Sequence, residues 1–234
     1  MKNFLPFPVP RPRSQEDISP KELIAHYNKI KPEIKRRIAE FRSIIKSGSE
    51  QDIFAELCFC ILTANANAVK CHEAIKELSG CDLLAGAPAC RIRPKLKGRA
   101  RFHNKKADYI VGVRKTFIDP GGLGGLCIKA KLDKKDIIGT RDWLVNSIKG
   151  YGYKEASHFL RNIGLGSDIA ILDRHVLKNL KRYSVIDKIP ASMGPRKVYI
   201  EIEEKMRSFS RDIGIPMDEL DLLFWSMQTG FIFK

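Results

Sequence analysis

The 234-residue sequence lacks any run of about 18 apolar residues, which excludes an ordinary membrane-spanning helix. Its N-terminus, MKNFLPFPVPRPRSQED, also lacks the continuous apolar segment and small-residue cleavage site of a signal peptide. We therefore expect a cytoplasmic protein that works without a membrane partner.

Zinc-type cysteine pairs are missing as well. The sequence has six cysteines, but none of their spacings gives C-x-x-C, and only His72 and His103 fall among them. A structural zinc site is therefore not expected, and in a reducing cytosol the cysteines should be free thiols.

Acidic residues are scarce, with 27 Asp and Glu against 42 Lys and Arg, so the net charge is +15. Such a surplus favours a polyanionic partner, nucleic acid ahead of membrane, although a generally lysine-rich surface is the alternative. The stretch RIRPKLKGRARFHNKK, residues 91–106, holds eight Lys or Arg and no acid. Its basic residues alternate up to position 101, a period that would place the charges on one side if the segment were extended. Lys105 and Lys106 are candidate DNA contacts; a solvated loop is the alternative.

Strand patterns and internal repeats are also absent, whereas helical periodicity runs through most of the chain, so we predict an all-α fold. Residues 1–18, with four prolines, form an extended lead-in, and Ser19 begins the first helix with a capping box. DPGGLGGL, residues 119–126, is the best candidate for a hinge or domain junction. Later helices are expected at about 103–118, 133–148, 154–163, 173–183, 195–212 and 217–229.

The stretch NSIKGYGYKEASHFLRNIG, residues 146–164, predicts a helix, a short hairpin and a second helix. Gly150 and Gly152 let backbone N–H groups converge beside a helix N-terminus. This arrangement can bind a phosphate without recognising the base sequence. Lys154 lies at the start of the second helix, where the helix dipole disfavours a cation. The alternatives are a nucleophilic amine and a surface lysine beside an ordinary turn.

Asp173, in AILDRHV, follows Lys154 by 19 residues and precedes a new helix. It is a good N-cap, but its carboxylate could also face a cleft that contains the Lys154 amine. Such a pair suits attack on the anomeric carbon of a deoxynucleotide. The amine must be neutral to attack, and the carboxylate stabilises the positive charge that develops on the sugar.

GYGYKEASHFL followed by LDRHV resembles the helix-hairpin-helix DNA glycosylases. FAELCFCILTANANA, FHNKKADYIV and the ending DLLFWSMQTGFIFK are similar to the type-2, archaeal-type 8-oxoguanine DNA glycosylase/AP lyases, over about residues 53–234. The resemblance implies two helical subdomains that flank a DNA-binding cleft. We expect one subdomain at about 50–125 and the other at 19–49 plus 126–234.

The resemblance makes Lys154 the Schiff-base nucleophile and Asp173 the catalytic carboxylate. Gly150 and Gly152 would grip a phosphate, and His175 matches a phosphate contact, with a surface residue at a helix start as the alternative.

In relatives the hairpin carbonyls also hold a monovalent cation, Na⁺ or K⁺, and Ile148 and Tyr151 are the matching positions. Asn65 would enter the gap left by the flipped nucleotide. Asn67 is expected to cap the next helix and to lie near the DNA backbone.

Base recognition is implied at the C-terminal end of the sequence. Lys234, the last residue, matches the C-terminal lysine that the family uses in its base pocket. A site that presents an acceptor to the N7–H of 8-oxoguanine selects the lesion, because guanine lacks this donor. Trp225 is the candidate aromatic wall, with Phe231 or Phe233 behind it. Simple core packing is the alternative for Trp225.

These features predict a bifunctional enzyme that excises 8-oxoguanine from duplex DNA and nicks the strand by β-elimination. The partners would be duplex DNA with 8-oxoguanine or abasic sites, and we expect a monomer near the nucleoid of a prokaryotic cell. No cysteine follows Cys127, so an iron–sulfur cluster of the endonuclease III type is not expected. A helix-hairpin-helix glycosylase for another base and a non-catalytic helix-hairpin-helix DNA-binding protein are the alternatives.

Overall fold

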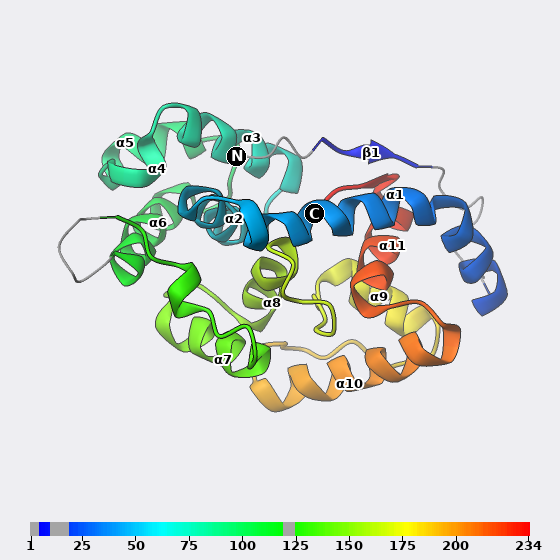
Figure 1. Ribbon diagram of the computed structural model, residues 1–234. Coiled ribbons are helices and arrows are strands. Elements are labelled where there is room, and N and C mark those ends of the chain that lie inside the picture. Colours follow the sequence, from blue (N-terminus) through cyan, green and yellow to red (C-terminus); the bar gives the residue numbers. More distant parts are fainter. Residues whose placement is uncertain (1–4, 10–18, 119–124) are drawn as a thin grey trace. The chain divides into compact units, whose positions relative to one another are not determined.

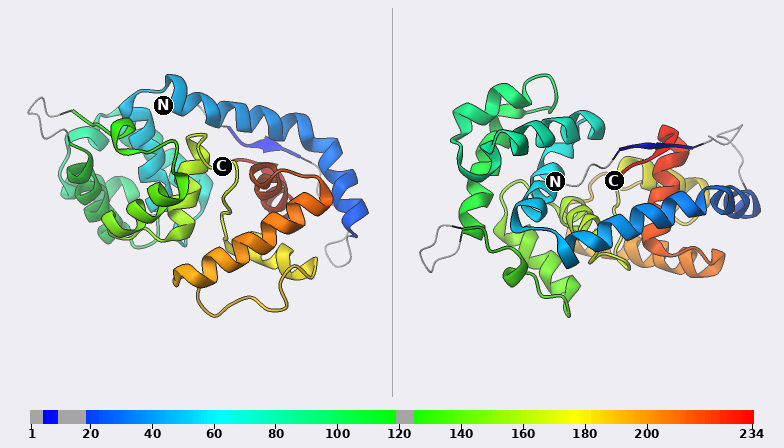
Figure 2. Two further views of the ribbon diagram at one scale, coloured as in Figure 1. Left: turned by 60° about the horizontal axis from the view of Figure 1, so that its bottom comes forward. Right: turned by 45° about the horizontal axis from the view of Figure 1, so that its top comes forward.

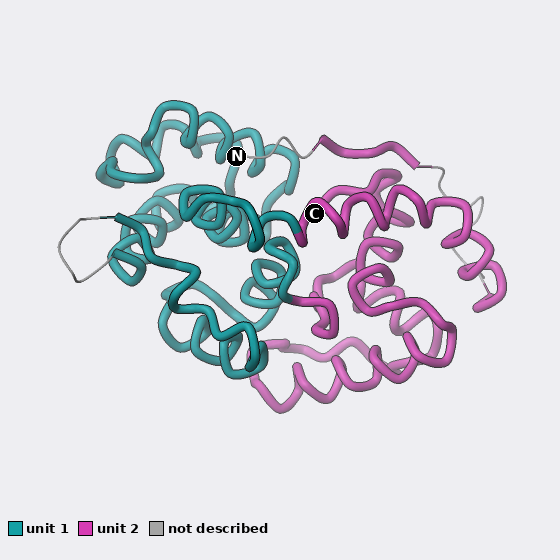
Figure 3. Tube along the Cα trace, viewed as in Figure 1, with its two compact units in different colours: residues 1–2, 43–165 teal, residues 3–42, 166–234 magenta. Residues whose placement is uncertain are grey.

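The computed structural model describes residues 5–9, 19–118 and 125–234, which are mostly helical as predicted (Figure 1). Two compact units divide these residues (Figure 3). Unit 1 covers residues 43–118 and 125–165, and unit 2 covers 5–9, 19–42 and 166–234. No helix among the described residues is long and apolar enough to cross a membrane.

Unit 1 is built around one central helix. Its elements in chain order are α2 (Glu50–Thr63), α3 (Ala68–Gly80), α4 (Leu83–Gly86), α5 (Ala89–Leu96), α6 (His103–Phe117), the 3-10 turn η1 (Lys129–Lys131), α7 (Ile137–Ser147) and α8 (Tyr153–Asn162). Every residue of α2 from Ile53 to Thr63 is buried, because this helix packs against α3, α6 and α8. Burial all round explains why its sequence is apolar on every face.

Unit 2 contains the C-terminal residue and most of the first helix. Its elements are β1 (Phe7–Pro8), the larger part of α1 (Pro20–Ser47), α9 (Arg174–Arg182), α10 (Arg196–Ile213), α11 (Met217–Thr229) and β2 (Phe231–Ile232). The predicted capping box starts α1: the Glu22 carboxylate accepts from the Ser19 N–H at 2.7 Å, and the Ser19 hydroxyl accepts from the Glu22 N–H at 3.3 Å.

The two short strands were not predicted. Phe7 pairs with Ile232 and Pro8 with Phe231 in an antiparallel ladder, and Figure 2 shows β1 beside the C-terminal segment. Two residues are too few for an alternating pattern, so a strand of this kind leaves no periodic signal in the sequence.

The compact units differ in extent from the expected subdomains. Residues 126–165 belong to unit 1. The chain passes from unit 2 to unit 1 between residues 42 and 43, and returns to unit 2 between residues 165 and 166. The expected hinge at 119–126 falls largely on residues outside the described part of the chain. Its flanks, Ile118 and Leu126, form an isolated antiparallel bridge within unit 1.

The basic stretch 91–106 is not extended, so its alternating charges do not lie on one side of a strand. Residues 89–96 form α5, and α6 begins at His103. Ile92 and Leu96, four residues apart, are both buried, so the apolar spacing of a helix decided the conformation over the alternation of charges. Several cations are paired with acids of neighbouring helices, for example Arg93 with Asp108 at 2.8 Å.

Candidate active site

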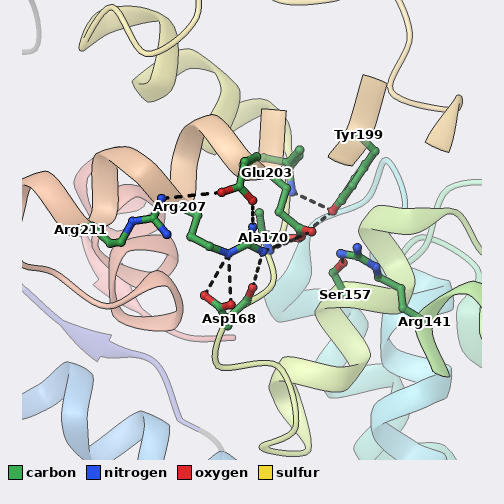
Figure 4. A network of polar contacts seen from close by, with 10 residues as sticks. Arg141, Ser157, Asp168, Ala170, Tyr199, Glu203, Arg207 and Arg211 are labelled. Carbon is green, nitrogen blue, oxygen red and sulfur yellow. Dashed lines mark hydrogen bonds and ion pairs between the residues drawn. The ribbon is translucent and has the colours of Figure 1, made fainter. Parts of the chain in front are cut away.

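The predicted helix-hairpin-helix is present in unit 1. α7 ends at Ser147, α8 begins at Tyr153, and the Tyr151 N–H donates to the Ile148 carbonyl at 3.1 Å inside the turn. The guanidinium of Arg141 in α7 donates to the hydroxyl of Ser157 in α8 at 3.2 Å, which ties the two helices together (Figure 4).

Gly150 is required by the backbone of this turn. Its φ is +87°, a left-handed value that favours glycine, and a Cβ at this position would lie 2.6 Å from the ring of Tyr109. The turn is also fixed to the core of unit 1, because the Tyr151 hydroxyl donates to the Leu57 carbonyl of α2 at 2.9 Å. The hairpin is therefore held rigidly in one conformation.

Lys154 is the second residue of α8, and 22% of its side chain is exposed. Its Nζ lies 3.3 Å from Oε1 of Glu155, whose Oε2 accepts a hydrogen bond from the Gly152 N–H at 3.2 Å. Glu155 was not among the predicted site residues. The sequence does carry a signal for Glu155, because it follows Gly152, the residue before the helix, by three positions. This is the spacing of a capping box.

The turn between α2 and α3 presents Asn65 to solvent. Asn65 is exposed and adopts a left-handed φ of 54°, which asparagine tolerates better than most residues. Asn67 caps α3, because its Oδ1 accepts from the Lys70 N–H at 3.0 Å. The predicted capping role of Asn67 is confirmed.

Lys106 is not the exposed cation that the basic stretch suggested. It is 4% exposed, and its Nζ donates to the carbonyls of Leu62 at 2.7 Å and Ala64 at 2.6 Å, at the C-terminal end of α2. Burial follows from its position on the inner face of α6, whereas the preceding residue, Lys105, faces solvent.

Asp173 lies in unit 2 and caps α9. Its Oδ1 accepts hydrogen bonds from the N–H groups of His175 at 2.7 Å and Val176 at 2.8 Å, so the predicted N-cap is confirmed. Within the described part of the chain, Oδ2 of Asp173 makes no hydrogen bond. One carboxylate oxygen is therefore held by the backbone and the other is available.

The segment that leads into Asp173 is anchored to α10 by a polar network (Figure 4). The buried Tyr199 hydroxyl donates to the Ala170 carbonyl at 2.7 Å and accepts from the Leu172 N–H at 3.2 Å. Glu203 accepts from the Ala170 N–H at 2.7 Å, so its buried carboxylate is satisfied.

The same network extends to the surface. Arg207 contacts both oxygens of Asp168 at 3.1 Å and lies 3.6 Å from Glu203, as Figure 4 shows. Arg207 therefore joins Asp168, at the start of the segment, to Glu203 of α10.

His175 is half-buried next to the Asp173 cap. Burial lowers the pKa of its imidazole; Asp173 opposes this shift, and Arg174 and Lys178 reinforce it. Its Nδ1 is buried without a hydrogen-bond partner among the described residues. A neutral imidazole is the form that these surroundings favour at neutral pH.

The predicted base-recognition residues cluster in unit 2. Trp225 contacts Phe231 edge to face at 5.0 Å between ring centroids, and Phe233 lies 6.3 Å from the same indole. Trp225 and Phe231 are partly exposed, whereas Phe233 is 0% exposed and can only support the indole from behind. Lys234 is 3% exposed, so the terminal lysine is folded into the protein.

The structure thus gathers the predicted site residues in two groups. Those of unit 1 are Asn65, Asn67, Lys105, Lys106, Ile148, Gly150, Tyr151, Gly152 and Lys154. Those of unit 2 are Asp173, His175, Trp225, Phe231, Phe233 and Lys234.

Comparison with known proteins agrees with this arrangement. The family model described as 8-oxoguanine DNA glycosylase matches residues 34–215. The 8-oxoguanine DNA glycosylase/AP lyase of Fusobacterium nucleatum is 42% identical over 215 residues, which cover 89% of this chain and 94% of that protein. The protein of the same description from Methanocaldococcus jannaschii is 40% identical over 210 residues, or 88% of this chain and 94% of that protein.

Solved structures agree as well. The crystal structure of the 8-oxoguanine DNA glycosylase of Thermotoga maritima superposes with a TM-score of 0.80 at 37% identity, over 92% of this chain and 98% of that one. The Methanocaldococcus jannaschii glycosylase/lyase in complex with a 15mer DNA containing 8-oxoguanine gives a TM-score of 0.79 at 39% identity, over 92% and 99%. The hairpin, the lysine behind it and this agreement along nearly the whole chain place the protein in the archaeal-type family of 8-oxoguanine DNA glycosylase/AP lyases.

Proposed function

We propose that Lys154 and Asp173 carry out the reaction of this 8-oxoguanine DNA glycosylase/AP lyase. The neutral Nζ of Lys154 attacks C1′ of the extruded nucleotide, the new C–N bond forms, and the bond from C1′ to the base breaks. The nitrogen then loses a proton as the sugar ring opens to the Schiff base. Loss of a C2′ proton expels the 3′ phosphate and nicks the strand, and water finally hydrolyses the imine to release Lys154.

The observation that carries this proposal is the position of Lys154. It follows a rigid hairpin at the start of a helix, is mostly buried, and has an ion-pair partner in Glu155. A hairpin that only gripped phosphate through backbone N–H groups would have no use for a buried lysine.

Asp173 would stabilise positive charge on the sugar as the base departs. The hydrogen bonds of its two oxygens support this role. Oδ1 caps α9, and Oδ2 remains free for the substrate. His175, at the start of α9, would contact a phosphate of the same strand.

Base recognition is assigned to the C-terminal cluster. The partly exposed Trp225 and Phe231 would stack on the extruded base, Phe233 would support the indole, and Lys234 would present an acceptor to N7–H of 8-oxoguanine. Guanine would be rejected because its N7 is an acceptor facing an acceptor.

The remaining contacts are proposed on the unit 1 side. Gly150 and Gly152 would bind a phosphate 3′ of the lesion, Asn65 would fill the gap left by the flipped nucleotide, and exposed Lys105 would contact the backbone. We further propose a monomer that acts on duplex DNA at the nucleoid of a prokaryotic cell. Carbonyls of Ile148 and Tyr151 are the proposed ligands of a monovalent cation.

Borohydride trapping on a duplex with a single 8-oxoguanine tests the nucleophile. The native protein should form a covalent complex, and Lys154→Gln should form none while it still binds an abasic-site duplex. Asp173→Asn keeps an N-cap acceptor, so it should preserve folding and DNA binding while losing most turnover. Trapping by Lys154→Gln, or an unchanged rate for Asp173→Asn, would remove that residue from the mechanism.

Deletion of Lys234 tests the base pocket separately. It should impair excision of 8-oxoguanine far more than nicking at a preformed abasic site, where no base has to be recognised. Equal losses on the two substrates would contradict a role in base recognition.

A further inference from the structure

The short strand β1 pairs with β2, and Phe231 of β2 belongs to the proposed base pocket (Figure 2). The Val9 N–H extends this antiparallel ladder, because it donates to the Gly230 carbonyl at 3.0 Å. Lys234 follows β2 by two residues, and all of these residues belong to unit 2. β1 therefore lies along the backbone that carries two of the proposed base-recognition residues.

The ladder between β1 and β2 is too short to be stable alone. Each strand has two residues, and even a longer isolated pair of strands is only marginally stable in water. The Thr229 hydroxyl adds one bond on the side of β2, where it donates to the Phe231 carbonyl at 3.2 Å. On the side of β1, the support comes from α1.

Arg37 of α1 holds β1 in place. Its side chain is 0% exposed, and its guanidinium donates to the Leu5 carbonyl and lies 3.0 Å from Oε2 of Glu40. The same guanidinium lies over the ring of Phe7, 4.4 Å from the ring centroid, and that of Arg36 lies over this ring at 3.8 Å.

The burial of Arg37 has a specific consequence for β1. A guanidinium is costly to bury, and an apolar side chain would fill the same space without that cost. An apolar side chain would also lack the hydrogen bond to Leu5 and the cation–π contact with Phe7. Arg37 therefore supplies a directional attachment for β1 that packing alone does not give.

We infer that β1, attached to α1 through Arg37, positions residues 230–234 so that Phe231 and Lys234 form the base pocket. This inference rests on the proposed role of these two residues in base recognition. Arg37 and β1 act through the backbone of the C-terminal segment and not through contact with the substrate. They are positioning elements for selection of the base, whereas the proposed nucleophile Lys154 belongs to unit 1.

The expected signature is a loss that is confined to the damaged base. When the ladder is weakened, only a fraction of the molecules presents an ordered pocket, and the apparent affinity for the extruded base falls by that fraction. Removing one hydrogen bond of the ladder should lower excision of 8-oxoguanine at subsaturating enzyme by up to about tenfold. Nicking at a preformed abasic site requires no base pocket, so it should keep its native rate.

Two pairs of variants test the ladder and its attachment. Val9→Pro removes the N–H that donates to the Gly230 carbonyl, and Val9→Ala is the matched control because it shortens the side chain and keeps the N–H. Arg37→Met fills the buried space without the charge or the hydrogen bond to β1. Lys35→Met is its control, because it removes a charge from an exposed position of the same helix.

Each variant would be compared in single-turnover excision of 8-oxoguanine and in nicking of an abasic-site duplex, with thermal unfolding to confirm folding. Val9→Pro and Arg37→Met should lower excision relative to nicking by up to about tenfold, and both controls should match the native protein. If Arg37→Met does not fold, the two Val9 variants still decide the question.

Native excision by Val9→Pro, or equal losses on the two substrates, overturns the inference. Deletion of Lys234 distinguishes this failure from failure of the proposed base pocket. If the deletion impairs excision selectively while Val9→Pro does not, the pocket assignment stands and only the role of β1 is wrong. Equal losses on both substrates in the deletion variant would remove Lys234 from base recognition and overturn the inference with it.

Discussion

The two halves of the proposed site are built in different ways. In unit 1, Lys154 is fixed by neighbours in the sequence, since Gly150 shapes the turn and Glu155 pairs with both the lysine and the hairpin. In unit 2, the segment that leads into Asp173 is fixed by side chains from a helix that follows much later in the chain, above all Tyr199. The comparison teaches that the proposed nucleophile is positioned by local backbone geometry, whereas the chain before the proposed carboxylate is positioned by tertiary contacts. Substitutions in the two halves should therefore differ in their effects on stability, DNA affinity and turnover.

The largest effect is expected for Gly150→Ala. The left-handed backbone costs about 1 kcal/mol for alanine, and the clash with the Tyr109 ring adds about 2 kcal/mol. Urea unfolding should show a loss of about 3 kcal/mol, and affinity for an abasic-site duplex should fall as the hairpin distorts. Gly98→Ala is the matched control, because Gly98 also has a positive φ, +76°, but no atom within 4 Å of the added Cβ. If the two variants lose the same stability, the Tyr109 contact does not constrain the hairpin.

The next effect is expected for Tyr199→Phe in the other half. Removing the hydroxyl leaves the Ala170 carbonyl and the Leu172 N–H buried without this partner, which costs about 2 kcal/mol. Because the segment leads into Asp173, kcat should fall more than affinity for the abasic-site duplex. Tyr183→Phe is the control, since the Tyr183 hydroxyl is buried without a partner among the described residues and its loss should cost nothing. A Tyr199→Phe enzyme with native kcat would show that the network supports the fold alone.

A smaller effect is expected for Glu155→Gln. The amide still accepts the hydrogen bond from Gly152, but the negative charge beside Lys154 disappears. The ion pair that favours the protonated amine is then lost, so the midpoint of the pH–rate profile should move down. An unchanged or raised midpoint would contradict an electrostatic effect of Glu155 on Lys154.

The smallest effect is expected for Lys105→Met. Loss of one exposed phosphate contact should reduce the slope of log K against log salt by about 1 and leave excision rates at saturating enzyme unchanged. Titration of labelled duplex at several salt concentrations measures this slope. An unchanged slope would mean that Lys105 does not contact DNA.

The sequence was informative wherever the determinants are close together along the chain. The hairpin, the helix that starts behind it and the caps at Ser19, Asn67 and Asp173 all follow from residues within a few positions of one another. Such short-range signals survive without knowledge of the tertiary structure. The all-helical class followed in the same way, from periodic apolar positions.

The errors arose where distant residues decide. Alternating charges at 91–101 left the conformation of this stretch open, and the burial of Ile92 and Leu96 in unit 1 accompanies a helix at residues 89–96. Lys106 was expected on the surface because lysine usually is, and its burial depends on acceptors more than 40 residues away in the sequence. Neither the packing of Ile92 and Leu96 nor the carbonyls that bind Lys106 can be recognised from residues 91–106 alone.

The cap made by Asp173 has a thermodynamic consequence for substrate binding. A free aspartate side chain samples several rotamers, and ordering it against a ligand costs conformational entropy. Here two backbone N–H groups hold one oxygen before any DNA arrives. The entropy cost of ordering this side chain is therefore met when the protein folds and not when DNA binds. The carboxylate is preorganised for the sugar, and ordering its rotamer does not reduce the affinity for DNA.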